Sequence, residues 1–146
     1  MSGRNWWVII LAGWVTIIIA SSFYGDPRDF LVVRKVHVFD AIEGHSPKMD
    51  VERVIRKPFR GEWLADVSRR EGGGFYAVCS GSGKSNYDPA DRLPANLYLD
   101  WWTYPVRCNL PVGCYEVNTV WTIEAPNVPA MAVRSVSNEF CIKPRT

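Results

Sequence analysis

Four cysteines are the most reactive side chains of this 146-residue chain, and their spacing favours disulfides over a metal site. No two of them form the Cys-x-x-Cys pair that zinc ribbons and fingers use. Cys114 and Cys141 lie symmetrically about the linker Ala125–Pro129, so an antiparallel hairpin around that linker would place them opposite each other. We therefore predict the disulfides Cys114–Cys141 and Cys79–Cys108, with Cys108–Cys114 and Cys79–Cys141 as the alternative.

The other potentially reactive groups form no catalytic or metal-binding pattern. Gly81–Ser85 (GSGKS) is similar to the end of a phosphate-binding loop, but Val78 stands where the first glycine should be and a turn sequence follows. We interpret the segment as a loop between strands. The two histidines, His37 and His45, lack further ligands around them, and no carboxylate pair or G-x-S-x-G nucleophile elbow stands out. We therefore predict a protein that is not an enzyme and holds no metal or cofactor.

One aromatic run is suited to ligand binding. If Leu97–Tyr104 is a strand, the alternation of its side chains places Leu97, Leu99 and Trp101 toward the core. Its outer face then carries a predicted binding surface of four residues: Tyr98, Asp100, Trp102 and Tyr104. Three rings around one carboxylate can stack on a sugar or dock on a protein partner. The alternative is that another strand or loop covers this face.

The elements that carry these residues begin with an apolar segment. Residues 6–24 contain no charge and would form about 28 Å of helix, close to the thickness of a bilayer core. Aromatic side chains at both ends match the interfacial belts of a membrane span: Trp6, Trp7, Phe23 and Tyr24. We therefore expect a cytoplasmic tip (1–5), a transmembrane signal anchor (6–24), a linker (25–29) and an exported domain (30–146).

The topology of that anchor follows from its flanking charges. Arg4 precedes the apolar segment, whereas the charges after it nearly cancel, which places the N-terminus in the cytoplasm. We expect a single-pass protein of the bacterial inner membrane with a periplasmic C-terminal domain. A cleaved secretory signal is the alternative and would release the domain. Both readings export the cysteines to an oxidising compartment.

The exported part reads as an all-β domain. Leu31–Phe39 is rich in valine and partly alternating, and short β-like runs broken by Gly, Pro, Asn and Asp continue from Val51 to Ile142. In the run Cys114–Ile123, Tyr115 and every second residue after it share a face. No helical period is sustained beyond residue 25. This pattern predicts an antiparallel β-sandwich or barrel.

Short motifs carry two resemblances. Leu110–Tyr115 (LPVGCY) resembles the corner before the sixth strand of immunoglobulin-like and fibronectin-like sandwiches, which implies a hydrogen bond from Tyr115 back to the corner backbone. Three further stretches resemble small, uncharacterised membrane-anchored proteins of tailed bacteriophages and prophages: Pro58–Trp63, Leu99–Thr103 and Ser137–Phe140. The expected fold is an immunoglobulin-like antiparallel β-sandwich preceded by one transmembrane helix.

The composition limits the classes of function that we expect for this chain. Charged residues make up 22% of the chain and the net charge is +2, which excludes a disordered polyelectrolyte and offers no concentrated basic surface for nucleic acid. We expect a non-enzymatic, membrane-anchored envelope protein of a phage or prophage, whose sandwich binds a protein partner in exclusion, lysis or assembly. The alternatives are a carbohydrate-binding module that contacts peptidoglycan or surface glycan, and a virion structural component.

Overall fold

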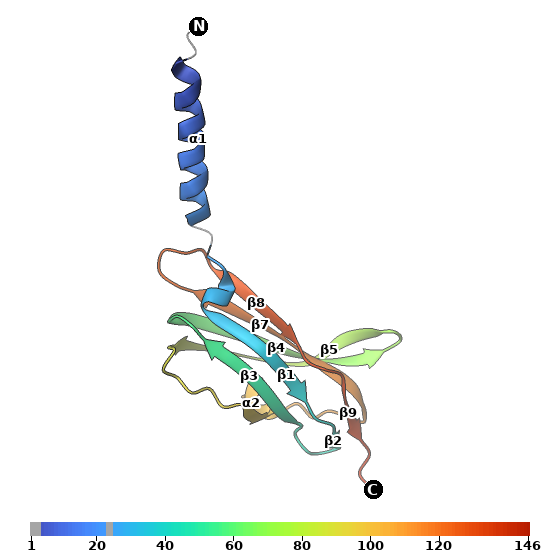
Figure 1. Cartoon of the computed structure of the whole chain (residues 1–146). Coiled ribbons are helices and arrows are strands. Elements are labelled where there is room, and N and C mark those ends of the chain that lie inside the picture. The colour runs from blue at the N-terminus through green and yellow to red at the C-terminus, as the bar shows by residue number, and fades with distance from the viewer. Residues whose placement is uncertain (1–3, 23–24) are drawn as a thin grey trace.

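The computed structural model describes residues 4–22 and 25–146, and shows an N-terminal helix followed by a domain of two β-sheets (Figure 1). The elements in chain order are α1 (Arg4–Ser22), the short 3-10 helix η1 (Pro27–Asp29), β1 (Leu31–Val38), β2 (Ala41–Ile42), β3 (Lys48–Ile55), β4 (Phe59–Glu71), β5 (Gly74–Tyr87), β6 (Asn96–Tyr98), α2 (Leu99–Thr103), β7 (Gly113–Glu124), β8 (Met131–Val136) and β9 (Phe140–Lys143).

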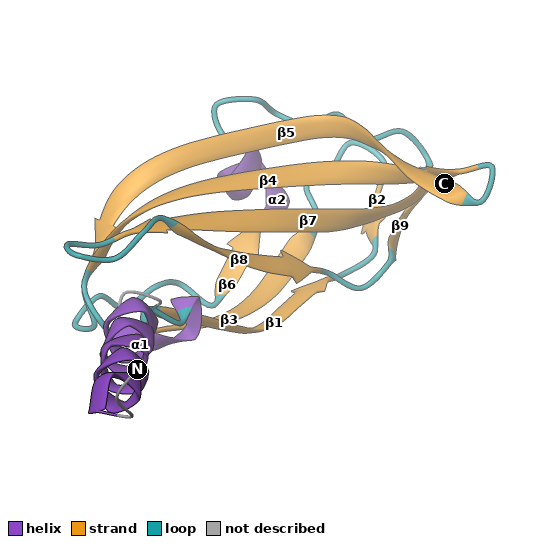
Figure 2. Ribbon diagram, turned by 90° about the horizontal axis from the view of Figure 1, so that it is seen from above, coloured by secondary structure: helices purple, strands orange, loops and turns teal. Residues whose placement is uncertain are grey.

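The strands form two layers of unequal size (Figure 2). The smaller sheet has the order β1-β3-β6. The larger has the order β2-β9-β7-β4-β5, and β8 pairs with the same side of β7 as β9 does, further along the strand. All pairs are antiparallel except β2 with β9. The prediction of a two-sheet, mainly antiparallel domain is confirmed.

The core lies between the two sheets and follows from alternation along their strands. In β7, Tyr115 and every second residue through Ile123 are buried, as the sequence predicted. From the smaller sheet, Val38, Met49 and Val51 face them and are also buried. Alternating apolar side chains on both inner faces explain why the two layers pack against each other.

The N-terminal helix forms, but the prediction that it spans a membrane is wrong. Among the described residues, no helix is both long and apolar enough to cross a bilayer. The apolar stretch Trp6–Ala20 within α1 extends about 22 Å, short of the ~30 Å hydrocarbon core. Trp6 and Trp7 lie in α1, whereas Phe23 and Tyr24, the other predicted interface anchors, lie outside the described residues. The predicted single-pass inner-membrane location is wrong for the same reason.

Both predicted disulfides are present. Cys114 lies directly opposite Cys141 in the β7–β9 ladder, with their Cα atoms 4.1 Å apart. Cys79 of β5 is joined to Cys108, in the segment between α2 and β7, with a Cα separation of 5.8 Å. Disulfides of this kind persist in oxidising compartments.

A three-residue break between β8 and β9 ties the two sheets together. The side chain of Asn138 accepts a hydrogen bond from the backbone N–H of Val38 and donates one to its carbonyl, at 2.8 and 2.9 Å. Ser137 continues the pairing with β7, because its N–H donates to the carbonyl of Val117 and its Oγ accepts from the N–H of Val117. The Asn138 amide thus takes the place of a strand partner for the end of β1.

The corner before β7 contains the hydrogen bond that the resemblance implied. The hydroxyl of Tyr115 donates to the carbonyl oxygen of Pro111 at 2.6 Å, while the ring is buried against Phe140. Burial raises the pKa of Tyr115, so the hydroxyl remains a donor at neutral pH. The corner is therefore closed by a side chain of the strand that it precedes.

The carboxylate of Asp40 links the connection between β1 and β2 to β9. It accepts a hydrogen bond from the N–H of Cys141 at 2.8 Å and pairs with Lys143 at 3.0 Å, and these contacts, that of Cys141 first, lower the pKa of Asp40. Because the pKa is lower in the folded state, the stabilisation is present above the unfolded-state pKa of ~3.9 and is lost as pH falls through the folded-state pKa.

We expect Asp40→Asn to lower the melting temperature at pH 7 and to have a smaller effect near pH 2, measured by circular dichroism. Glu43→Gln, which changes an exposed carboxylate in the adjoining turn, is the control and should alter stability little at either pH. An equal loss from Asp40→Asn at both pH values would show that the carboxylate charge is not responsible.

Candidate functional site

The segment predicted to carry the binding surface is partly a helix. Leu97 and Leu99 are buried as expected, but α2 begins at Leu99, so Trp102 follows three residues later on the same face. Trp102 is 1% exposed and Trp101 is 53% exposed. The prediction that Trp102 faces outward and Trp101 inward is therefore wrong, because helical spacing replaces strand alternation at this point.

Gly81 of β5 allows α2 to pack directly on the larger sheet. A Cβ atom at this position would lie 2.4 Å from the Cα of Thr103 and 2.5 Å from the carbonyl oxygen of Trp102. Glycine is therefore required for this contact. The segment Gly81–Ser85 lies within β5, so the interpretation of it as a loop is wrong.

Contacts at both ends hold α2 in place. At its N-terminal end, the N–H of Leu99 donates to the carbonyl of Pro47 at 2.9 Å, and the N–H of Asp100 donates to the Oγ of Ser46 at 3.1 Å. Beyond its C-terminal end, the Cys79–Cys108 disulfide fixes the following segment to β5. The helix is thus joined to the β2–β3 connection on one side and to the larger sheet on the other.

A cation in the core supports the buried face of α2. The guanidinium of Arg53, on β3, lies 5.7 Å from the ring centroids of both Trp102 and Trp121, within range of cation–π attraction. Its Nη2 donates to the carbonyl of Pro94 at 3.0 Å. Burial lowers the pKa of Arg53 from its ordinary value, yet a guanidinium remains charged in proteins. Arg53 therefore links the two indoles across the core.

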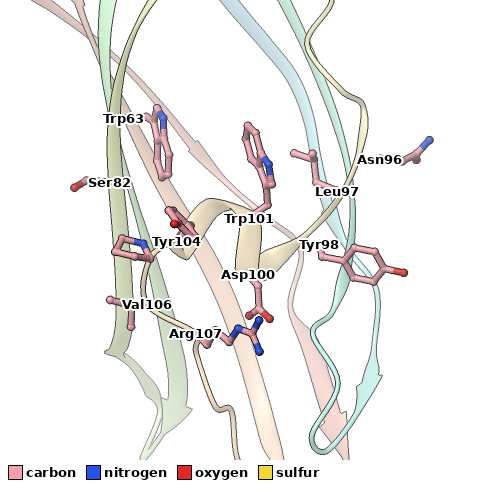
Figure 3. Close-up of a pocket in the computed structure, with 11 residues that line it drawn as sticks. Trp63, Ser82, Asn96, Leu97, Tyr98, Asp100, Trp101, Tyr104, Val106 and Arg107 are labelled. Atoms are coloured by element: carbon pink, nitrogen blue, oxygen red, sulfur yellow. The ribbon is translucent and has the colours of Figure 1, made fainter.

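The exposed side of α2 forms the floor of a cleft of about 780 Å³ that lies between β5 and β6 (Figure 3). Its aromatic lining consists of Trp63, Tyr98, Trp101 and Tyr104, and its polar lining of Ser82, Asn96, Asp100 and Arg107. Figure 3 shows Trp63 and Trp101 on opposite sides of the opening, with Tyr104 below Trp63. In this view, the side chains of Asp100 and Arg107 are drawn below Trp101.

Trp63 is placed by a second glycine of β5. It is half-buried and leans over Gly83, its partner in the β4–β5 register, where a Cβ atom would lie 2.8 Å from the indole. Its ring also contacts Trp121 at 6.5 Å between centroids, in a tilted arrangement. The indole therefore lies over β5 and forms one side of the cleft. Its contact with Trp121 in the core holds it in that position.

Three of the four predicted surface residues reach the cleft. Tyr98, Asp100 and Tyr104 line it, whereas Trp102 lies beneath it in the core. Sequence reasoning missed Trp63, Trp101 and Arg107, which come from β4, α2 and the segment after α2. The signal in the sequence was the pair of alternating glycines, Gly81 and Gly83, which marks a strand that other groups approach closely.

The cleft is equipped for binding. Asp100 is the one carboxylate among its lining residues, and no group of three or more His, Cys, Asp or Glu side chains that could hold a metal ion occurs in the described part of the chain. The lining instead combines aromatic side chains with hydrogen-bonding groups, a combination typical of ligand sites. Comparison with protein-family models, curated proteins and solved structures found no match to the chain, so the function is argued from this site.

We expect Gly81→Ala to destabilise the domain by roughly 1–3 kcal/mol, because the added methyl group would overlap the backbone of α2. Gly74→Ala is the matched control in the same strand, since its Cβ atom would meet only the ring of Tyr76 at 3.8 Å. Urea denaturation of both variants measures the difference. A loss for Gly74→Ala as large as that for Gly81→Ala would contradict the packing argument.

The two adjacent tryptophans of α2 should behave differently. Trp102→Ala removes a fully buried indole and should destabilise the domain by about 3–5 kcal/mol, whereas Trp101→Ala changes an exposed side chain and should cost less than about 0.5 kcal/mol. Thermal and urea melts of the two variants provide the measurement. A reversed order of stability would show that the assignment of faces in α2 is incorrect.

Proposed function

We propose that this protein is a non-enzymatic binding domain of an oxidising compartment, and that the cleft above α2 binds carbohydrate. The observation that carries this proposal is the arrangement of Trp63, Trp101 and Tyr104 around one open cleft, beside the polar side chains of Asp100 and Arg107. Among the alternatives raised by the sequence, the geometry favours the carbohydrate-binding module over the protein-binding domain.

The chemistry of a sugar matches both halves of the cleft. A pyranose ring has apolar C–H faces that pack against indole and phenol rings, and hydroxyl groups at its edge that donate and accept hydrogen bonds. Trp101 and Tyr104 offer exposed rings, at 53% and 73% exposure. Asp100 supplies acceptors and Arg107 supplies donors. A flat ligand with apolar faces and a polar edge therefore satisfies the lining better than a purely apolar side chain.

The rigidity of the walls adds to this argument. The backbone of Asp100 is fixed by Ser46, Trp63 is held against Gly83 and Trp121, and Cys108 is covalently joined to β5. A preformed site loses little conformational freedom when it binds, which matters for sugars because their hydroxyl groups already interact well with water. The walls of the cleft are thus already in place before a sugar binds, which favours binding of such a polar ligand.

Protein binding remains a second candidate because of a different surface. The β4–β5 hairpin extends past the rest of the sandwich (Figure 1), and its β5 arm exposes Phe75, Tyr76 and Val78. Exposed apolar groups at a protruding end are typical of protein contacts. This surface is separate from the cleft, so the two candidates can be distinguished by substitution.

We expect Trp101→Ala to weaken binding to immobilised glycans, including purified peptidoglycan, by about tenfold, which corresponds to ~1.4 kcal/mol. The reason is loss of one stacking face while the fold is retained. Binding is measured on a glycan panel by surface plasmon resonance, with melting temperature recorded for each variant.

Tyr76→Ala is the control, since it removes a comparably exposed ring from the hairpin. It should leave glycan binding unchanged. If neither the wild type nor either variant binds any glycan, and pull-down of an envelope protein is lost only with Tyr76→Ala, the protein-binding candidate replaces the proposal.

A further inference from the structure

A second pocket of different chemistry shares two lining residues with the aromatic cleft. This pocket, of about 200 Å³, is lined by Gly44, His45 and Ser46 from the connection between β2 and β3, and by Asn109 from the segment before β7. Asp100 and Arg107 line both spaces. We infer that the cleft and this polar pocket form one extended site for an oligosaccharide of at least two sugar rings, an inference that rests on the proposed carbohydrate function.

The shared residues form the junction between the two subsites. Arg107 is exposed, and in the described part of the chain neither its guanidinium nor the Asp100 carboxylate takes part in an ion pair. Because both residues line the two pockets, they mark the boundary between them. Donors and acceptors are therefore both available where a glycosidic link between two rings would pass.

The two subsites differ in what they can hold. The cleft has four Trp and Tyr side chains, whereas the polar pocket has no Trp, Tyr or Phe and is lined by an imidazole, a hydroxyl and an amide beside Leu110. The aromatic cleft suits the apolar face of a sugar ring. The polar pocket suits a sugar ring that is bound through the hydroxyl groups at its edge. A single sugar would therefore bind in the aromatic cleft, while a linked pair also uses the polar pocket.

A hydrogen bond and a disulfide hold the two subsites in a fixed position relative to each other. Ser46 lines the polar pocket, and its Oγ accepts the hydrogen bond from the backbone of Asp100. Asn109 follows Cys108, which is bonded to Cys79 of β5. The walls of the polar pocket are therefore attached to the same helix and strand that position the aromatic cleft, so a ligand spanning both meets a fixed distance between them.

Isothermal titration with two defined probe series tests the inference: N-acetylglucosamine and its β-1,4-linked oligomers up to the tetramer, and glucose with the corresponding cello-oligomers. For at least one series, we expect the tetramer to bind at least tenfold more tightly than the monosaccharide. The double variant His45→Ala/Asn109→Ala should remove this gain and leave affinity for the monosaccharide unchanged, because only the polar pocket is altered.

Two further variants separate this inference from the proposed function. Trp101→Ala should weaken binding of the monosaccharide and the tetramer alike, and Glu43→Ala, in the same connection but outside the pocket, should change neither. Equal affinity for all lengths, or a length gain that survives the double variant, overturns the extended site while leaving carbohydrate binding intact. Absence of binding to both series also overturns the inference, and the glycan panel then decides the proposed function.

Discussion

The close contact between α2 and β5 at Gly81 determines how one open side of this domain is built. The smaller sheet has too few strands to cover the larger one, and α2 follows its last strand and lies over β5. Because the helix backbone touches the strand backbone, Trp102 is directed into the core beside Arg53 while Trp101 is directed outward. The same contact therefore completes the core and creates the floor of the cleft.

Much of the β-structure could be predicted from the sequence because it depends on alternation and register. The face of β7 that begins at Tyr115 is buried as the pattern indicated, because side chains alternate along a strand. Symmetry about the Ala125–Pro129 linker predicted the pair Cys114–Cys141 correctly. The β7–β8 ladder alone would place Cys114 opposite Phe140, and the break between β8 and β9 shifts the register by one residue to Cys141.

The site could be predicted only in part, because its geometry depends on contacts distant in sequence. A helix of five residues is too short to show a period, so the sequence pattern predicts a strand in place of α2 and puts Trp102 on the wrong face. Trp63 comes from a strand far from α2 in the chain, and only the pairing of β4 with β5 brings it over Gly83. Arg107 follows α2 closely, but the position of its segment depends on the disulfide between Cys108 and Cys79 of β5. The apolar N-terminal segment was recognised as a helix, but its described length does not support the predicted membrane span.

The two disulfides hold different parts of the domain. The Cys79–Cys108 bond is the covalent link between β5 and the segment that carries Arg107 and Asn109, whereas the Cys114–Cys141 bond joins strands already paired by a ladder. The segment between α2 and β7 is held at its ends by these two elements, and along its length by the bond from Cys108 to β5. Reduction of the Cys79–Cys108 bond would therefore loosen the part of the cleft wall that carries Arg107, whereas reduction of Cys114–Cys141 would leave its two strands joined by their ladder.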